Sequence, residues 1–352
     1  MDRIRKNLKG MFGAGPALLA LCAVIALTLA LGGPTFAAPK VMKYGHFQPA
    51  KLDQPKHAAA LAFKTYVEAN TKGSVKVEIY PASQLGNEVT VIEGLKMGTM
   101  ELIVLHDGPI STFYKPFMVF ALPYLFDDQA MAWTVVDSPF GKEMAEDMRK
   151  TTGIRMMALA DNGIRHFTNS KRVIKSPDDM KGLKIRVMTG PIWSKLVESL
   201  GASPSPVPWT ELPAALQQGV VDGQENGVTN ILAASLYQSQ KYISLDGHVY
   251  SWHAYLMNDK FFSSLTPEEQ KVVLKGIQIA KVIHRGMTCA QDLNAPTILG
   301  GLGMEVTALS PEQVAAFRAK AQPAVRAWVE EQIGKDWVNK LFGAIEAYKK
   351  GN

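Results

Sequence analysis

The sequence predicts an α/β fold that is built from mostly parallel sheets and divided into two domains. Strand-like and helix-like patterns alternate from residue 40 onward, and residues 41–105 follow the order strand, helix, strand, helix, strand. Removing residues 1–37 from the 352 leaves 315, which exceeds a comfortable single core. No Ser/Gly-rich linker separates two halves, so we expect the chain to cross between the domains more than once through structured strands.

The N-terminal segment predicts a secretory signal peptide over residues 1–37. Basic residues come first, an apolar run "ALLALCAVIALTLALGG" follows, and the small-residue stretch "PTFAA" ends it. The alternative is an uncleaved membrane anchor, but the small residues directly after the apolar run favour cleavage near Ala38. The basic residues of this segment are Arg3, Arg5, Lys6 and Lys9.

The composition of the mature chain excludes some classes of protein. Loss of these four basic residues and Asp2 lowers the formal charge from +6 to +3, and no basic cluster with interleaved aromatic residues remains. We therefore expect no nucleic-acid partner. Cys289 is the one cysteine left, so the mature chain has no internal disulfide, and a small buried hydrophobe on a helix is its simplest role.

The first half of the mature chain shows clear periodicities. Alternation with period two marks the strand at 75–80, and helical spacing that ends in Gly73 marks the helix before it. Right-handed crossovers between parallel strands are the default for this order. The expected elements are a strand at 41–47, a helix at 56–73, a strand at 75–80, a helix at 88–99 and a strand at 101–105.

The second half of the mature chain also alternates between strand and helix patterns, and it contains strong helix-start signals. The stretches "TPEE" (266–269) and "SPEQ" (310–313) each place a capping residue, a proline and a box-closing Glu or Gln at the correct spacing. Long helices are expected after both. Two further strands are predicted, one at 154–160 ("IRMMALA") and one around "GLKIRVM" (182–188).

Enzyme and metal signatures are missing from the sequence. It has no GxSxG, HExxH or P-loop motif and no GxGxxG that opens a helix. The seven histidines are scattered without metal-ligand spacing. The sequence therefore predicts neither catalytic residues nor a metal or cofactor.

Two arginines stand out because of their positions near predicted strand ends. Arg186 shares one strand face with Lys184 and Met188, and Arg165 follows the strand at 154–160. Ligands of open α/β sheets bind outside the carboxyl ends of the strands, and a guanidinium matches a carboxylate with two parallel hydrogen bonds. A structural ion pair or an exposed sheet edge would also explain such arginines.

A series of short motifs covers essentially the whole mature chain. None is decisive alone, but their order and spacing are highly specific. The chain resembles the solute-binding proteins of TRAP (tripartite ATP-independent periplasmic) transporters, of the DctP type. The motifs are "YGH" (44–46), "IYPASQLGNE" (79–88), "FALPYLF" (120–126), "GIRHFTNS" (163–170), "MKGLKIRVM" (180–188), "GASPSPVPW" (201–209), "ALQQGVVDGQEN" (215–226) and "SLTPEEQ" (264–270).

This resemblance implies a two-lobed, periplasmic-binding-protein-like fold. Each lobe is then a mostly parallel sheet flanked by helices, and a long helix spans both. The implied division assigns residues 40–163 and 252–291 to lobe I. Residues 164–251 and 292–352 form lobe II, which includes the C-terminal helices.

The resemblance also implies ligand-binding residues. Arg186 occupies the position whose arginine forms a two-pronged salt bridge to the ligand carboxylate, and Arg165 supports the same anion. Asn226 matches an asparagine near the carboxylate. Trp209 matches a pocket-lining position, although it could serve only to fix its helix to the core. Glu88 faces the cleft in some relatives, although it could simply complement a helix dipole.

Two departures from the family pattern bear on the site. Gly227 replaces the proline that usually follows "QEN", and the stretch "LHDGP" (105–109) is unusual. The latter suggests that His106 or Asp107 reaches the cleft. Trp252 and His253 are candidates for an aromatic wall. Trp193, Trp209 and Trp252 favour an acid with an aromatic or hydrophobic tail.

The function implied by the resemblance is periplasmic capture of a small organic acid. The ligand would be delivered to the small and large membrane subunits of a permease that is driven by an ion gradient. A monomer without cofactor or metal is expected. A periplasmic ligand sensor is the main alternative, and an enzyme acting on organic acids is a weaker one. The sequence leaves the identity of the acid open.

Overall fold

The computed structural model describes residues 38–351 of the chain. The predicted signal peptide at 1–37 and the last residue lie outside the described residues. No helix between residues 38 and 351 combines the length and the apolar character needed to cross a membrane.

The order of elements confirms the predicted strand–helix alternation. The strands are β1 (Lys40–His46), β2 (Val75–Tyr80), β3 (Leu102–His106), β4 (Ile154–Asn169), β5 (Lys184–Val187), β6 (Ser203–Pro206), β7 (Gly223–Gly227), β8 (Tyr242–Asn258) and β9 (Glu305–Ala308). The helices are α2 (Pro55–Asn70), α3 (Glu88–Met97), α4 (Asp107–Phe113), α5 (Gln129–Asp137), α6 (Pro139–Thr152), α7 (Pro191–Leu200), α8 (Leu212–Gln217), α9 (Val228–Ala233), α10 (Asp259–Ser264), α11 (Pro267–Gly301), α12 (Pro311–Ile333) and α13 (Asp336–Gly351). Short 3₁₀ helices are η1 (Lys115–Ala121), η2 (Pro177–Met180), η3 (Trp209–Glu211) and η4 (Leu236–Gln238).

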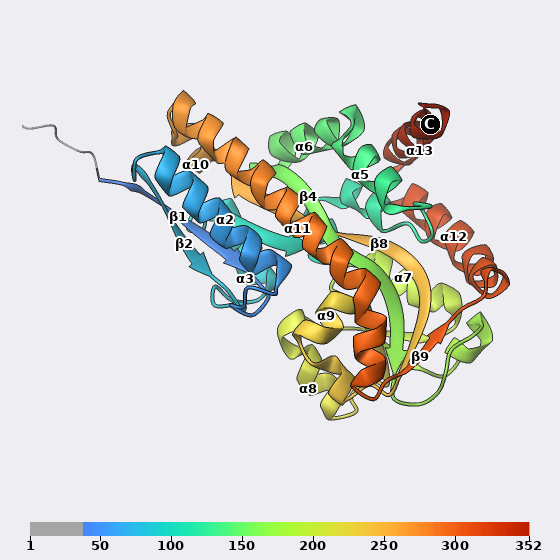
Figure 1. Ribbon diagram of the computed structural model, residues 1–352. Helices are drawn as coiled ribbons and strands as arrows, with labels where there is room; N and C mark the ends of the chain where they lie inside the picture. Colours follow the sequence, from blue (N-terminus) through green and yellow to red (C-terminus); the bar gives the residue numbers. More distant parts are fainter. Residues whose placement is uncertain (1–37, 352) are drawn as a thin grey trace, which may run out of the picture. The chain divides into compact units, whose positions relative to one another are not determined.

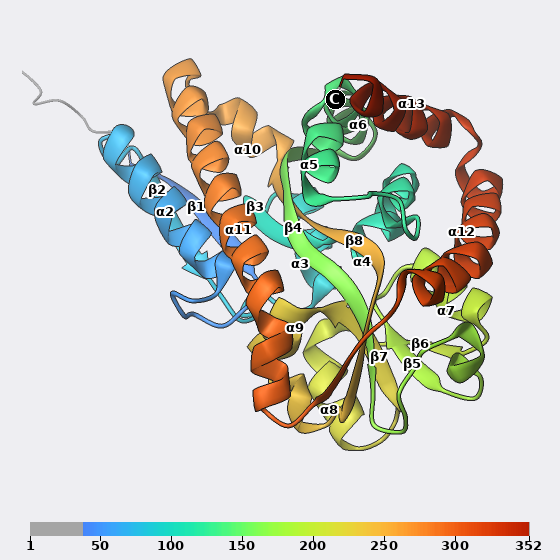
Figure 2. The ribbon, with the colours of Figure 1, turned by 45° about the vertical axis from the view of Figure 1, so that its right-hand side comes forward.

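Two groups of parallel strands define two lobes. In the first lobe β1 pairs in parallel with β2 and β3, and in the second lobe β5 pairs in parallel with β6 and β7. Between them, the long strands β8 and β4 pair antiparallel with each other and with β3 and β7, giving the order β2-β1-β3-β8-β4-β7-β5-β6. Figure 2 shows β4 and β8 running from one group to the other. The chain therefore crosses between the lobes within structured strands, as we predicted from the lack of a Ser/Gly-rich linker in the sequence.

Alternating side chains of each strand pack on opposite helical layers. In β3, Leu102 and Val104 join the cluster formed with α2 and the first part of α11, whereas Ile103 and Leu105 join the cluster that contains α3. In β5, Ile185 packs with α7 and α12, which places Arg186 on the opposite face. The largest cluster is continuous between the two lobes.

The long helix α11 contacts both lobes, as the predicted fold class requires. It begins at a capping box in which Thr266 accepts a hydrogen bond from the backbone of Glu269, whose side chain accepts one in return. It packs against α2 in the first lobe and α9 in the second (Figure 1). The predicted α/β, two-lobed architecture is therefore confirmed.

Candidate functional site

A small cavity of about 20 Å³ lies where the two lobes meet. The first lobe and the crossing strands contribute one set of lining residues, and the second lobe contributes the other. The lining residues are Phe47, Lys56, His106, Asn162, His253, Arg186, Met188, Trp209, Asn226 and Asn230. They include two cationic side chains and three asparagines but no aspartate or glutamate.

Arg186 presents the free part of its guanidinium to this cavity. Its Nε donates to the backbone oxygen of Val207 at 2.8 Å, while Nη1 and Nη2 have no partner among the described residues. The side chain is only 1% exposed. Burial lowers the pKa of Arg186 to about 10, and Arg165 acts in the same direction. The group therefore stays charged at neutral pH, with two adjacent donors free.

Arg165, by contrast, is already paired. Its Nε donates to Oε2 of Glu225, and its Nη2 donates to Oε1 at 3.0 Å and to the backbone oxygen of the same residue at 2.6 Å. The guanidinium stacks on the ring of Trp193 at 4.9 Å and is not among the lining groups. Nη1 is its one donor group without a partner among the described residues.

The position of Arg165 corrects one expectation. The predicted strand at 154–160 continues as β4 to Asn169, so Arg165 lies inside a long strand rather than just after its end. The sequence pattern breaks there because β-bulges shift the register between Asp161 and Gly163 and between Arg165 and Phe167.

A chain of alternating charges extends from Arg165 into the second lobe. Nε2 of His248 lies 3.3 Å from Oε2 of Glu225, and its Nδ1 lies 2.9 Å from Oδ2 of Asp246. Burial alone would lower the pKa of His248, but Asp246 and Glu225 raise it to about 9. Burial raises the pKa of Glu225, yet Arg165 and His248 outweigh this and lower it.

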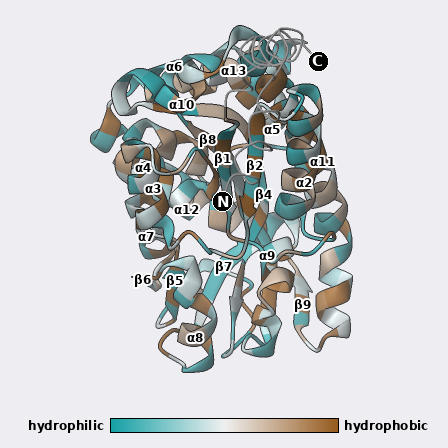
Figure 3. Cartoon of the chain, turned by 90° about the vertical axis from the view of Figure 1, so that its left-hand side faces the viewer, coloured by the Kyte–Doolittle hydropathy of each residue, from teal (hydrophilic) through white to brown (hydrophobic). Residues whose placement is uncertain are grey.

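These four groups therefore form two cations and two anions with no exposed side-chain surface at Arg165, Glu225 and His248. The chain is neutral in itself, and Glu225 offsets the effect of burial on the pKa of Arg186 only in part. Glu225 lies on β7, where all five residues are buried despite their polar character. Figure 3 shows this strand in the hydrophilic colour inside the fold.

Asn226 faces the cavity from the same strand. Its Nδ2 donates to Oε1 of Gln224 at 3.0 Å, and its Oδ1 accepts from Nδ2 of Asn230 at 3.0 Å. Nδ2 of Asn230 also donates to Oδ1 of Asn162 at 2.7 Å, which joins the second lobe to β4. The three asparagines thus form a fixed polar wall, because each amide is oriented by its neighbour.

Glu88 connects the lobes rather than lining the cavity. Its Oε1 accepts the backbone N–H of Trp209 at 2.9 Å and lies 3.2 Å from Nε2 of His106. Burial raises its pKa, but His106 and the Trp209 amide outweigh this and lower it to about 2. Trp209 and His106 themselves line the cavity.

Asp107 lies behind the cavity wall. Its Oδ2 accepts hydrogen bonds from Oγ of Ser251 at 2.9 Å and from the backbone N–H of Trp252 at 3.0 Å, while Oδ1 has no partner among the described residues. Burial raises its pKa. The carboxylate therefore fixes α4 to β8 and does not reach the lining set.

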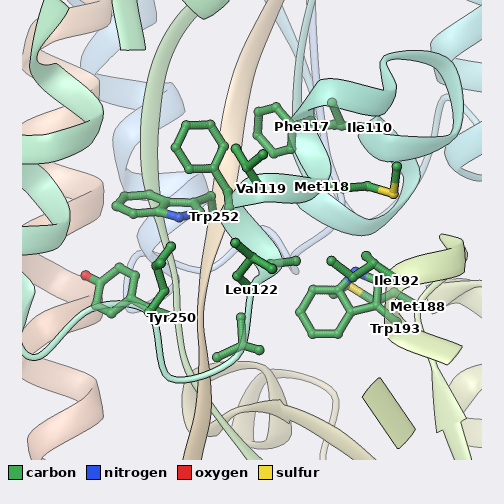
Figure 4. Close-up of a cluster of buried hydrophobic side chains, with 14 of the residues drawn as sticks. Ile110, Phe117, Met118, Val119, Leu122, Met188, Ile192, Trp193, Tyr250 and Trp252 are labelled. Atoms are coloured by element: carbon green, nitrogen blue, oxygen red, sulfur yellow. The ribbon is translucent and has the colours of Figure 1, made fainter. Parts of the chain in front are cut away.

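The aromatic residues of the site differ from the expectation. Trp193 and Trp252 are fully buried in the hydrophobic core, and Figure 4 shows both among aliphatic and aromatic side chains. Only Trp209 of the three tryptophans lines the cavity, together with Phe47 and His253. The pocket is therefore less aromatic than expected from the sequence, because two of the three tryptophans pack in the core.

Lys56 is the lining residue that sequence reasoning missed. It is 4% exposed, and its Nζ has no hydrogen bond or salt bridge to any described residue. Burial and the charge of Arg165 together lower its pKa to about 7. A signal was present, since a lysine directly after Pro55 places a positive charge in the first turn of a helix, where the dipole disfavours it.

No group of three or more metal-ligating side chains occurs between residues 38 and 351. The lining residues offer hydrogen-bond donors and positive charge to the cavity. Such a surface is suited to binding a small anion.

Comparisons with known proteins point to one family. A family model described as "Bacterial extracellular solute-binding protein, family 7" matches residues 45–332. A solute-binding protein of Verminephrobacter eiseniae is 35% identical over 282 residues, which cover 80% of this chain and 83% of that protein.

Two solved structures are similar along nearly their whole length. One is the sugar acid binding protein DctPAm of Advenella mimigardefordensis, in complex with galactonate, with a TM-score of 0.83 and 30% sequence identity. The alignment covers 90% of this chain and 99% of that protein's chain. A TRAP periplasmic solute binding protein of Polaromonas sp JS666, bound to D-erythronate, has a TM-score of 0.81 and 32% identity, with coverage of 87% and 98%.

The neutral chain of charges predicts a large effect of Glu225→Gln on stability. The amide leaves Arg165 and His248 without their shared anion in a buried site, so the free energy of unfolding should fall by about 3–5 kcal/mol. Denaturant titration measures this loss. Glu305→Gln, at an exposed position of β9, is the control and should change stability by less than about 0.5 kcal/mol. A similarly small loss for Glu225→Gln would contradict the proposed pairing.

The raised pKa of His248 predicts how the free energy of unfolding depends on pH. Its pKa is raised in the folded state, so its contribution to stability is complete below pH 6.5 and is lost as the pH rises through about 9. At about 1.4 kcal/mol per pKa unit, the loss is roughly 3 kcal/mol. Unfolding free energies measured from pH 6.5 to 9 should fall for the wild type and less steeply for His248→Asn. Equal slopes would exclude a charged His248, and His57→Asn serves as the control.

Proposed function

Because the chain belongs to family 7 of the bacterial extracellular solute-binding proteins, we propose that it captures a small carboxylic acid between its two lobes. The acid binds in the cavity that both lobes line, with its carboxylate on Arg186. The protein works in the periplasm after removal of residues 1–37, and it releases the acid to the small and large subunits of a TRAP permease. It binds its ligand as a monomer and does not transform it.

The free edge of Arg186 is the observation that carries this proposal. Two unpartnered N–H groups of a guanidinium match the two oxygens of a carboxylate, and charge-assisted bonds of this kind are roughly twice as strong as neutral ones. The two acids that act on Arg186, Glu225 and Glu88, are bound to Arg165 and to the Trp209 amide, so neither forms an ion pair with Arg186. The ligand supplies the missing charge.

The unpaired positive charge of the cavity also couples closure of the lobes to ligand binding. Bringing the lobes together over an empty cavity removes unpaired cations from water, which costs several kcal/mol. A bound carboxylate removes most of this cost, so ligand binding and closure are coupled. The bond from Glu88 to the Trp209 amide and the 3.4 Å contact of Gln48 with Asn230 then hold the closed form together.

The moving parts are lobe I (40–163 and 252–291) and lobe II (164–251 and 292–352). We place the bending region in β4 and β8, where the register shifts between Asp161 and Gly163. Gly163 has φ +95°, a conformation that glycine adopts without strain, and a local change there would reorient the strands. Helix α11 contacts both lobes and limits the motion.

The polar wall favours a hydroxylated acid over one with an aromatic tail. The lining asparagines and histidines offer hydrogen bonds along the cavity, and the related structures contain galactonate and D-erythronate. A sensory role, in which the closed protein is read by a receptor instead of a permease, uses the same cavity and differs only in the partner.

Arg186→Met tests the anchor. The variant keeps the length and burial of the side chain but removes both donors, so affinity for the acid should fall at least about 100-fold, the equivalent of two charge-assisted bonds. Thermal shift against a library of carboxylic acids, followed by calorimetry on the hits, measures the loss. Arg318→Met, at an exposed site on α12, is the control. Ligand stabilisation that survives in Arg186→Met would overturn the anchor role.

A further inference from the structure

Asn162 lines the cavity, and its orientation is fixed by groups that lie outside it. We propose that Asn162 is a specificity-determining residue, which turns an N–H group toward the ligand and so rejects acids that carry an ammonium group beside the carboxylate. Ser251 and Asp107 are its positioning residues. This inference rests on the proposed function, since it deepens the same site.

A chain of hydrogen bonds that begins behind the cavity wall orients Asn162. Oδ2 of Asp107 accepts from the backbone N–H of Trp252 at 3.0 Å and from Oγ of Ser251 at 2.9 Å. The backbone N–H can only donate, so it holds Oδ2 in the role of acceptor. Because Ser251 spends its single hydroxyl proton on Asp107, its oxygen is left to accept from Nδ2 of Asn162 at 2.9 Å. The amide nitrogen of Asn162 therefore points toward Ser251.

A second chain fixes the same orientation from the other lobe. The backbone N–H of Gly227 donates to Oδ1 of Asn226 at 3.1 Å, so that oxygen is an acceptor. Nδ2 of Asn230 donates to this oxygen at 3.0 Å and to Oδ1 of Asn162 at 2.7 Å, which uses both of its protons. A flipped Asn162 amide would place two N–H groups against each other. Each chain ends at a backbone N–H, which cannot reverse its role.

The amides therefore present donors to the ligand. The bonds to Ser251 and Gln224 use one of the two protons on Nδ2 of Asn162 and of Asn226, and the other proton of each remains. These protons join the free donor groups of Arg186 at the same cavity. Because the cavity measures only about 20 Å³, all of them face one small space. A ligand atom beside the carboxylate must therefore accept hydrogen bonds.

His253 completes a site that suits a hydroxyl group. Its Nδ1 lies 3.1 Å from the backbone oxygen of Asp161, which can only accept, so Nδ1 carries the proton and Nε2 keeps a lone pair. Burial holds the pKa of this ring well below 6.5, so the ring stays neutral. A hydroxyl can accept from Asn162 and donate to an acceptor of this kind. An ammonium group accepts no bond from the amides, and it adds a positive charge next to Arg186.

Pairs of acids that differ only in the group on the carbon next to the carboxylate test this selection. Calorimetry compares lactate with alanine, glycerate with serine, and gluconate with 2-amino-2-deoxygluconate, each as both enantiomers. Wild-type protein should bind the hydroxy acid of at least one pair about 100-fold or more tightly than the amino acid, because the ammonium group leaves buried donors unpaired.

Two variants locate the selection. Asn162→Asp replaces the donor by a negatively charged acceptor of the same shape, so the ratio of the two affinities should fall at least about tenfold. Ser251→Ala removes the bond that holds the Asn162 amide and should lower the ratio about twofold to tenfold. Asn339→Asp makes the same change as Asn162→Asp at an exposed position of α13 and should keep the wild-type ratio.

The ratio separates selection from a purely structural role, which would weaken both members of a pair equally. If wild type binds hydroxy and amino acids equally well, or if Asn162→Asp keeps the ratio, the role of Asn162 is wrong while acid capture on Arg186 stands. An unchanged ratio in Ser251→Ala overturns the positioning role, and this variant decides the matter if circular dichroism shows Asn162→Asp to be unfolded. If wild type binds no carboxylic acid at all, both proposals fall.

Discussion

The pairing of Arg165 with Glu225 is the interaction on which the rest of the site depends. Glu225 acts on both Arg165 and Arg186, but its carboxylate is bound by Arg165 and His248. The network ends at Asp246 and is neutral as a whole. Arg186 is therefore left with positive charge and free donors in a place where water is largely excluded.

The unpaired positive charge of Arg186 links the fold to the function. The crossing strands β4 and β8 and the polar strand β7 hold the network, and β5 holds Arg186. The polar side chains of β7 are buried because they are bonded to one another and to Arg165 and His248. A cavity with cations but no acids does not close favourably on itself. The interlobe bond of Glu88 can hold the closed form only after an anion has offset this cost.

Much of the fold could be predicted from the sequence because it depends on local patterns. Period-two alternation located β2, and the capping box at Thr266 located the start of α11. The placement of Arg186 at a strand end could also be predicted from the sequence. The pairing of Arg165 was not, because Glu225 is 60 residues away and meets it only through the antiparallel register of β4 and β7. Lys56 was missed because its burial depends on packing between lobes.

We propose that unpaired cations hold the empty cleft open. Small-angle X-ray scattering of the double variant Arg186→Met/Lys56→Met, without any ligand, can test this. Empty wild type should have a larger radius of gyration than its ligand-bound form, and the empty double variant should already have the smaller value. An empty double variant that remains as extended as empty wild type would contradict the claim.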